Sequence, residues 1–161
     1  MSLTTEIRAF LDDYIAHWNA YDVARLRALW DSEEENPIYV AEEADVLYGW
    51  PALERYWAVD RSSSERLIKY GNLETKEAAP GVAIAFYQLS WNVYLRNIRL
   101  YPKPIGGTVR VSALLRRKPE GWRLFHYVEA PLAAMIQVRR ALEAAVDPEL
   151  FEILQRKGIS T

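Results

Sequence analysis

The strongest constraint on the fold is a change of apolar periodicity near residue 66. Ahead of it, apolar residues recur at helical spacing, and after it four long runs alternate as strands do. The expected strands are Leu67–Ala78, Val82–Ile98, Gly107–Lys118 and Trp122–Glu129. Pro80-Gly81 and Pro119-Glu120-Gly121 predict tight turns between neighbouring strands, which favours a mostly antiparallel sheet.

Helical spacing and capping residues define the part of the chain ahead of these strands. A first helix is expected from about Thr5 to Ala20, with Thr4 or Thr5 as its cap. Asp22 is expected to cap a second helix, and Gly49-Trp50-Pro51 to open a third. Residues 36–48, between those helices, indicate a short hairpin.

Helical spacing returns after the last strand. Pro131 to Ala145 predicts a fourth helix, and Asp147-Pro148 predicts the cap and first turn of a fifth helix, Glu149–Lys157. We therefore expect one domain over residues 1–161, with a core at about residues 5–130 and a helical extension at about 131–158. Since the apolar residues of the extension need burial, the extension is expected to be docked.

Composition excludes several classes of partner. The 161 residues carry 20 basic and 22 acidic side chains, well mixed, for a net charge of −2, whereas nucleic-acid binders usually gather a basic excess on one face. No apolar run approaches the ~20 residues of a membrane helix, so no membrane partner is expected. The chain has no cysteine, which is compatible with the cytoplasm, the expected location.

Aromatic residues are abundant: six Trp, ten Tyr and four Phe. In a small domain such residues fill a core, line a pocket or build an interface. The strand Val82–Ile98 is largely apolar on both faces, so one face is expected to meet helices and the other a second copy of the chain or a pocket. The residues around Tyr87, Leu89, Trp91 and Val93 predict a homodimer through the exposed face of the sheet.

Three segments carry a resemblance to a known superfamily. They are residues 14–22 (YIAHWNAYD), residues 49–53 (GWPAL), and residues 110–117 (RVSALLRR) followed by 121–127 (GWRLFHY). In order and spacing they resemble the NTF2-like superfamily, and within it the SnoaL-like, polyketide cyclase or ketosteroid isomerase-like, domains. The resemblance covers roughly residues 5–130. It implies an α+β cone, with three N-terminal helices packed on a strongly curved, mostly antiparallel sheet and extra C-terminal helices.

The same resemblance implies a function but leaves alternatives open. One is a cofactor-independent isomerase, cyclase or dehydratase that acts on a small apolar or aromatic ligand. Another is a non-catalytic, dimeric binding or association module, because this fold hosts both kinds of protein. A third is a structural subunit resembling the β-subunit of ring-hydroxylating dioxygenases. Whether the chain is an enzyme stays open at this point, and no cofactor is expected.

The candidate catalytic residues are His126, Tyr14 and His17. Tyr14 falls where ketosteroid isomerases place a tyrosine that donates to a developing oxyanion. The histidines titrate near neutral pH and can move a proton. Two histidines without cysteine make a poor metal site, so no metal is expected. Ser112 and Ala113 stand where the isomerase needs a protonated acid, which counts against steroid isomerisation.

The candidate substrate-binding residues are aromatic or polar side chains expected near the cavity: Trp18, Trp57, Tyr39, Asn92, Arg110, Glu42 and Glu129. On the last strand, alternation places His126 on one face and Tyr127 and Glu129 on the other. We expect His126 and Tyr14 to lie on opposite walls of one cavity. If the other face is inward, Glu129 takes that place, and a bulge in the strand inverts the alternation.

Overall fold

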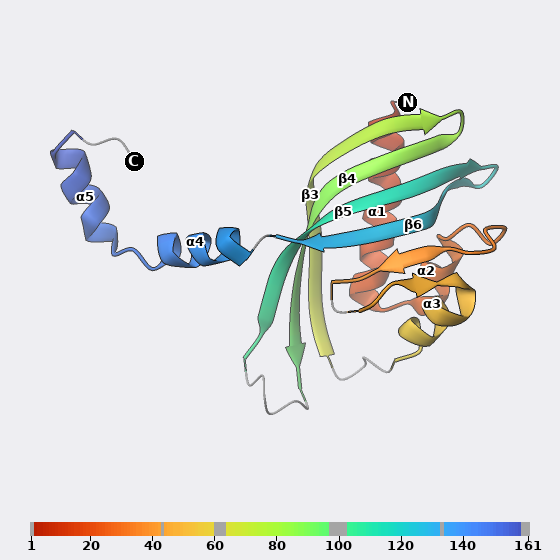
Figure 1. The fold of residues 1–161 in the computed structure, drawn as a ribbon, viewed down its shortest axis with the longest axis horizontal. Coiled ribbons are helices and arrows are strands. Elements are labelled where there is room, and N and C mark those ends of the chain that lie inside the picture. The colour runs from red at the N-terminus through yellow and green to blue at the C-terminus, as the bar shows by residue number, and fades with distance from the viewer. Residues whose placement is uncertain (1, 43, 60–63, 97–102, 133, 159–161) are drawn as a thin grey trace. The chain divides into compact units, whose positions relative to one another are not determined.

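The computed structural model describes residues 2–42, 44–59, 64–96, 103–132 and 134–158, without the side chains of residues 134–137. The chain divides into two compact units, Met1–Pro131 and Leu132–Thr161. In the first unit, helices pack on a curved sheet that does not close into a barrel (Figure 1). The predicted α+β class, with three N-terminal helices and a mostly antiparallel sheet, is confirmed.

The elements of the first unit follow the predicted order. They are α1 (Leu3–Ala20), α2 (Val23–Ala28), β1 (Ile38–Val40), β2 (Leu47–Tyr48), α3 (Gly49–Trp57), β3 (Ser64–Ala79), β4 (Val82–Leu95), β5 (Ile105–Lys118) and β6 (Gly121–Pro131). The sheet order is β2-β1-β6-β5-β4-β3. All neighbours are antiparallel except β1 and β6, where Ile38 lies opposite His126 in a parallel pair.

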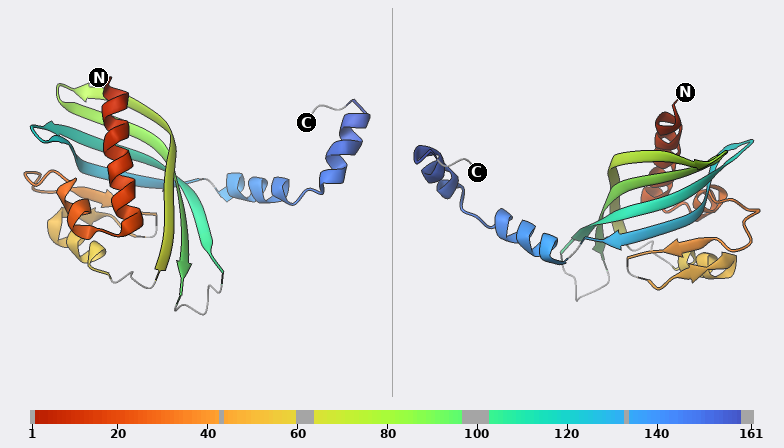
Figure 2. Two further views of the ribbon diagram at one scale, coloured as in Figure 1. Left: turned by 180° about the vertical axis from the view of Figure 1, so that it is seen from behind. Right: turned by 45° about the horizontal axis from the view of Figure 1, so that its top comes forward.

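Helix α1 runs across one face of the sheet, which we call the inner face (Figure 2, left). On β4, Ala83, Ala85, Tyr87 and Leu89 are buried on this face, while their neighbours along the strand are more exposed. Strand alternation explains the pattern, because successive side chains point to opposite faces. The sequence interpretation of Tyr87 and Leu89 as dimer-contact residues was therefore wrong, since both belong to the core.

The other face of the sheet, the outer face, carries the remaining apolar side chains of β4. Phe86 is 47% exposed there, and Ile84 is partly buried. Residues that pair across strands share a face, so Ser112 and Val128 lie beside Phe86 on this surface. The exposed apolar residues of β4 therefore lie on the face of the sheet opposite to the one predicted.

A β-bulge near the middle of β6 decides which of its residues face inward. Leu114 pairs with His126, but the next residue of β5, Leu115, pairs with Leu124, so Phe125 is an extra residue. Such an insertion shifts the alternation of the strand by one position. As a result Leu124 and Tyr127, three positions apart, are both buried on the inner face.

The element boundaries differ from the expected ones by a few residues. The cap of α1 is Ser2, whose hydroxyl accepts from the Thr5 amide, and neither Thr4 nor Thr5 is the cap. The predicted cap Asp22 is confirmed, because its carboxylate accepts from the Arg25 amide. Strand β5 begins two residues before the predicted Gly107, and the predicted end of β4 at Ile98 lies outside the described residues.

The second unit contains α4 (Ala134–Ala144) and α5 (Pro148–Arg156). The predicted cap Asp147 is confirmed by its contact with the Glu149 amide, at 2.9 Å. Four large apolar side chains of this unit are exposed: Val138, Leu142, Leu150 and Phe151. The helices were predicted correctly, and the docking of the extension stays a prediction. Over the described residues, we find no helix with the length and apolar character needed to cross a bilayer.

Candidate functional site

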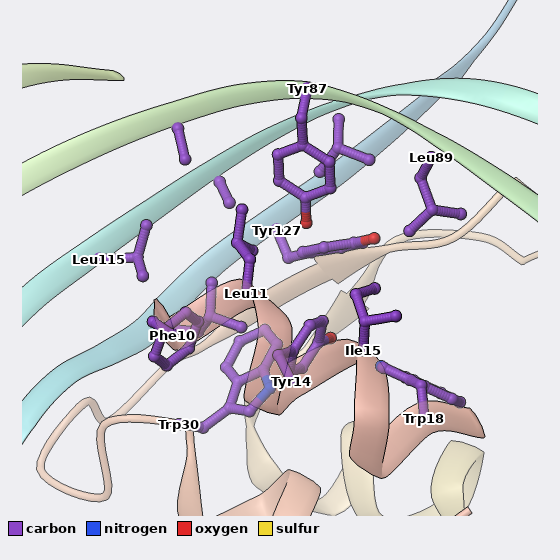
Figure 3. Packing of buried hydrophobic residues seen from close by; sticks show 14 of the residues in the cluster. Phe10, Leu11, Tyr14, Ile15, Trp18, Trp30, Tyr87, Leu89, Leu115 and Tyr127 are labelled. Carbon is purple, nitrogen blue, oxygen red and sulfur yellow. The ribbon is translucent and has the colours of Figure 1, made fainter. Parts of the chain in front are cut away.

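Aromatic side chains from α1, β1, β4 and β6 meet between α1 and the inner face of the sheet (Figure 3). Tyr127 stacks on Tyr39, with 5.0 Å between ring centroids and 7° between planes. The Tyr14 ring lies 6.0 Å from Tyr127 and meets Trp18 edge-on at 6.4 Å. Three of the predicted site residues, Tyr14, Trp18 and Tyr39, are therefore brought together by the fold.

Two hydroxyl groups in this cluster are buried without a hydrogen bond. The Oη atoms of Tyr14 and Tyr87 find no partner among the described residues, although the Tyr87 hydroxyl is directed at Tyr127 (Figure 3). Burial raises the pKa of both tyrosines well above the usual value, so both stay protonated at neutral pH. Each is a hydrogen-bond donor that is kept at a cost of about 1–3 kcal/mol of stability.

Glu129 brings a carboxylate to these hydroxyls. Its Oε1 accepts from the Tyr127 hydroxyl and its Oε2 from the Glu42 backbone amide, each at 3.0 Å. After burial, the charge of Glu129 is a further cause of the raised pKa of Tyr14, Tyr87 and Tyr127. The inner face thus combines the Glu129 carboxylate with several phenol hydroxyls in an apolar surrounding.

Glu42, in the segment that follows β1, contacts both Glu129 and Trp91. Its carboxylate Oε2 accepts a hydrogen bond of 2.8 Å from the indole Nε1 of Trp91 on β4. Its backbone amide donates to Glu129 on β6. Both acidic residues predicted for the site are therefore present in it, linked through the backbone of Glu42.

His126 does not lie in this site. It pairs with Leu114 and Ile38 on the outer face, while its neighbour Tyr127 is the residue that packs against Tyr14. The prediction that His126 and Tyr14 face each other was therefore wrong, and the β6 bulge is the physical reason. Partial burial lowers the pKa of His126, which favours its neutral form.

Comparison with known proteins identifies the family. The family model of the SnoaL-like domain matches residues 7–134. This chain belongs to the SnoaL-like domain family. No curated protein matches the sequence.

Solved structures similar to this SnoaL-like chain share the fold at low sequence identity. A protein assigned as a dehydratase of the NTF2-like family from Streptomyces avermitilis is 15% identical, with a TM-score of 0.69 over 81% of this chain and 97% of that one. A ketosteroid isomerase-like protein from Erwinia carotovora is 13% identical, with a TM-score of 0.65 over 81% and 96%. The CamKII hub homology domain of Chlamydomonas reinhardtii is 13% identical, with a TM-score of 0.64 over 83% and 100%.

Several predicted site residues of this SnoaL-like chain lie away from Glu129. His17 pairs with Asp13 one turn earlier on α1, at 3.1 Å. Asn92 is exposed and donates to the Leu67 carbonyl, and exposed Arg110 donates to the Pro131 carbonyl, each at 3.2 Å. Trp57 is buried against Trp30, with 5.9 Å between ring centroids. The fold does not bring His17, Asn92 or Arg110 into the aromatic cluster.

The sequence analysis did not include Tyr87, Tyr127 and Trp91 among the candidate site residues of this SnoaL-like chain. Their place on the inner face is set by the side of β4 that meets α1 and by the β6 bulge. Alternation with Leu89 offered a signal for Tyr87 and Trp91, but it did not tell which face was inward. Among the residues that the structure describes, no group of three metal-ligating side chains is close enough together to hold a metal ion.

Proposed function

We propose that this SnoaL-like protein binds a small apolar or aromatic ligand between α1 and the inner face, and moves a proton on it without a cofactor. Glu129 is the proposed base, and the hydroxyls of Tyr14 and Tyr87 are the proposed donors to the ligand oxygen. One observation carries the proposal: the buried hydroxyls of Tyr14 and Tyr87, which have no hydrogen-bond partner among the described residues, lie near the partly buried carboxylate of Glu129. Proteins usually keep such costly groups where function needs them.

The chemistry follows from these groups. A ligand with a C–H bond next to a carbonyl loses that proton to the Glu129 carboxylate, and the bond electrons move to the carbonyl oxygen. Donors already directed at that oxygen stabilise its developing charge in a site shielded from water. With a β,γ-unsaturated ketone, the protonated Glu129 then gives the proton to the γ-carbon of the dienolate, which completes an isomerisation. With a β-hydroxy ketone, it gives the proton to the hydroxyl group, which leaves as water while the enolate electrons form the new C=C bond, and this completes a dehydration.

The structural neighbours support the class of reaction without naming the substrate. One is assigned as a dehydratase and another is ketosteroid isomerase-like, and dehydration and isomerisation are the two outcomes proposed above. In the present chain the proposed base comes from the last strand of the sheet, at Glu129. Tyr14 keeps the donor role expected from the sequence, and Glu129 replaces His126 as the group that moves the proton.

Hydrogen exchange on a simple ketone tests this proposal. In deuterium oxide, the protein is expected to speed exchange of the α-protons of 2-tetralone, followed by NMR. Glu129→Gln is expected to lower the protein-dependent rate constant by about 100-fold or more, in the range for loss of a general base. Glu74→Gln is the matched control, because Glu74 is exposed on β3 and pairs with Phe86 of the outer face. Equal rates for Glu129→Gln and wild type would overturn the proposal.

The outer face favours association as a second function. Phe86 is 47% exposed on it, beside partly buried Ile84 and Val128. Exposed apolar surface of this kind marks interaction sites. We propose that two copies pair through this face, and the similarity of the fold to a hub homology domain is consistent with association. Light scattering is expected to give twice the chain mass of 18.6 kDa, and Phe86→Glu to give the monomer mass. A wild-type monomer over a wide concentration range would contradict this.

A further inference from the structure

We infer that Trp91 is a positioning residue for Glu129, acting through Glu42, and that Gly107 exists to let it do so. The inference rests on the proposed function, because it concerns how the proposed base is held. It also makes a claim about the resting protein that is measurable without any substrate.

The contact chain runs from β4 to β6 over the strand between them. The Trp91 indole donates to the Glu42 side chain at 2.8 Å, and the Glu42 backbone amide donates to Glu129 at 3.0 Å. Strand β5 lies between β4 and β6 in the sheet. Glu42 therefore links β4 and β6, which are not neighbours in the sheet. Its side chain contacts β4, and its backbone amide contacts β6. Fixing the side chain fixes the direction in which its amide points.

Gly107 makes room for the indole. It lies directly opposite Trp91 in the β4–β5 pair. A Cβ atom at residue 107 would lie 2.9 Å from Cζ2 of the Trp91 ring, closer than real Cβ contacts, and 3.0 Å from Cε2, so the ring would have to move. The backbone of Gly107 has no positive φ, so the residue is needed for space and not for conformation. The ring thus lies directly on β5 because residue 107 has no side chain.

The consequence for Glu129 is electrostatic. A hydrogen bond donated to a carboxylate stabilises its charged form. The Glu42 amide supplies one such bond and the Tyr127 hydroxyl another. The titratable residues that face Glu129 include Tyr127 and Glu42 in direct contact, with Tyr14 and Tyr87 beyond them. If the Trp91 indole no longer holds Glu42, the Glu129 carboxylate loses the Glu42 amide as a donor. Glu129 then binds its proton more tightly.

Replacing the indole while keeping an aromatic ring tests this chain. In Trp91→Phe, the carboxyl ¹³C resonance of Glu129 is expected to titrate at higher pH than in wild type, by about half a unit, the loss of one hydrogen bond to the charged form. The 2-tetralone exchange rate constant is expected to fall by about tenfold, as misplacement of a reacting group slows chemistry. Gly107→Ala is expected to change both quantities in the same direction, because its methyl group displaces the ring.

Trp122→Phe is the matched control. The Trp122 indole also donates to a carboxylate, Glu6 at 3.0 Å, but it lies seven residues from Glu129 along β6. This variant is expected to leave the Glu129 titration and the exchange rate constant unchanged. Circular dichroism confirms folding of each variant before measurement.

The outcomes separate the two claims. An unchanged Glu129 titration in folded Trp91→Phe overturns the positioning role, even if Glu129→Gln abolishes exchange. A shifted titration in Trp91→Phe but not in Trp122→Phe supports the role, even if Glu129→Gln retains exchange and the proposed function fails. Equal shifts in both tryptophan variants also overturn it, because they indicate a general loss of packing.

Discussion

Two acidic residues associated with β6 differ in their surroundings: Asp31 contacts β6 through its backbone amide, and Glu129 is a residue of β6. Asp31 is fully buried, accepts from Arg116 and from Lys118, and donates its own amide to the Leu124 carbonyl. Glu129 is held by a tyrosine hydroxyl and a backbone amide, among aromatic rings. A carboxylate matched by two cations is fixed in its charged form and serves stability. A carboxylate beside phenol donors has the arrangement that we propose for sharing those donors with a ligand.

The pKa of Asp31 fits the structural role. Burial alone raises the pKa of Asp31, but hydrogen bonds from Lys118 and Arg116 outweigh it and hold the pKa below the usual value. Glu34 extends the ion pairs, at 3.2 Å from Arg116. Glu33 and Glu34 of the acidic run at residues 33–35 thus anchor the loop after α2 to β5.

The largest expected effect on stability comes from Asp31. Asp31→Asn is expected to lower the free energy of unfolding by about 3 kcal/mol, because it leaves two cations without their buried partner. Glu129→Gln is expected to change it by less than about 1 kcal/mol, since an amide oxygen still accepts one hydrogen bond. Urea unfolding followed by tryptophan fluorescence measures both values. Equal losses of unfolding free energy in the two variants would contradict the distinction between Asp31, assigned to stability, and Glu129, assigned to the proposed site.

The second prediction is the pH dependence of that stability. The folded pKa of Asp31 is lowered, so its contribution is present above the unfolded pKa, near 3.8, and is lost as the pH falls through the folded pKa. Wild-type stability is therefore expected to drop below about pH 4. Asp31→Asn is expected to drop less over the same range. Parallel urea series between neutral and acidic pH check this, and identical acid profiles would refute it.

The third prediction concerns the hydroxyls. Tyr14→Phe is expected to raise the free energy of unfolding by about 1 kcal/mol, because a buried donor without a partner is removed. It is also expected to slow 2-tetralone exchange by about tenfold or more. Tyr127→Phe instead loses a hydrogen bond to Glu129 and is expected to lower stability by about 1 kcal/mol. Loss of stability in Tyr14→Phe would indicate a structural hydroxyl.

The smallest expected effect is that of His126. His126→Gln is expected to leave the exchange rate constant within about twofold of wild type and stability within about 0.5 kcal/mol, as for a substitution away from the core. The outer-face position of His126 is the reason. A large loss of 2-tetralone exchange in this variant would indicate that His126 takes part in the reaction. It would contradict the assignment of Glu129 as the base.

Local signals in the sequence predicted most of the fold. Asp22 and Asp147 mark helix starts because a short carboxylate caps the helix beside it, and these contacts span only two or three residues. Tyr14 was predicted to be inward because it shares a helical stripe with Leu11 and Trp18, and all three are buried.

The site was less predictable, because it depends on register between distant strands. The β6 bulge exists only in the pairing of Leu114 and Leu115 with β6, so no pattern within β6 reveals that His126 turns outward. The link between Trp91, Glu42 and Glu129 joins residues up to 87 positions apart. Gly107 was predicted as the start of a strand, and its role appears only when Trp91 lies opposite it.

A crystal structure with 2-naphthol, a small aromatic alcohol, tests the central claim most directly. We expect density for the ring between α1 and the inner face, beside Tyr127 and Leu89. The naphthol oxygen is expected within hydrogen-bond distance of the Tyr14 or Tyr87 hydroxyl, with the ring edge toward Glu129. Naphthol bound only on the outer face, or absent from the inner face at saturating concentration, would contradict the assignment of this region as a ligand site.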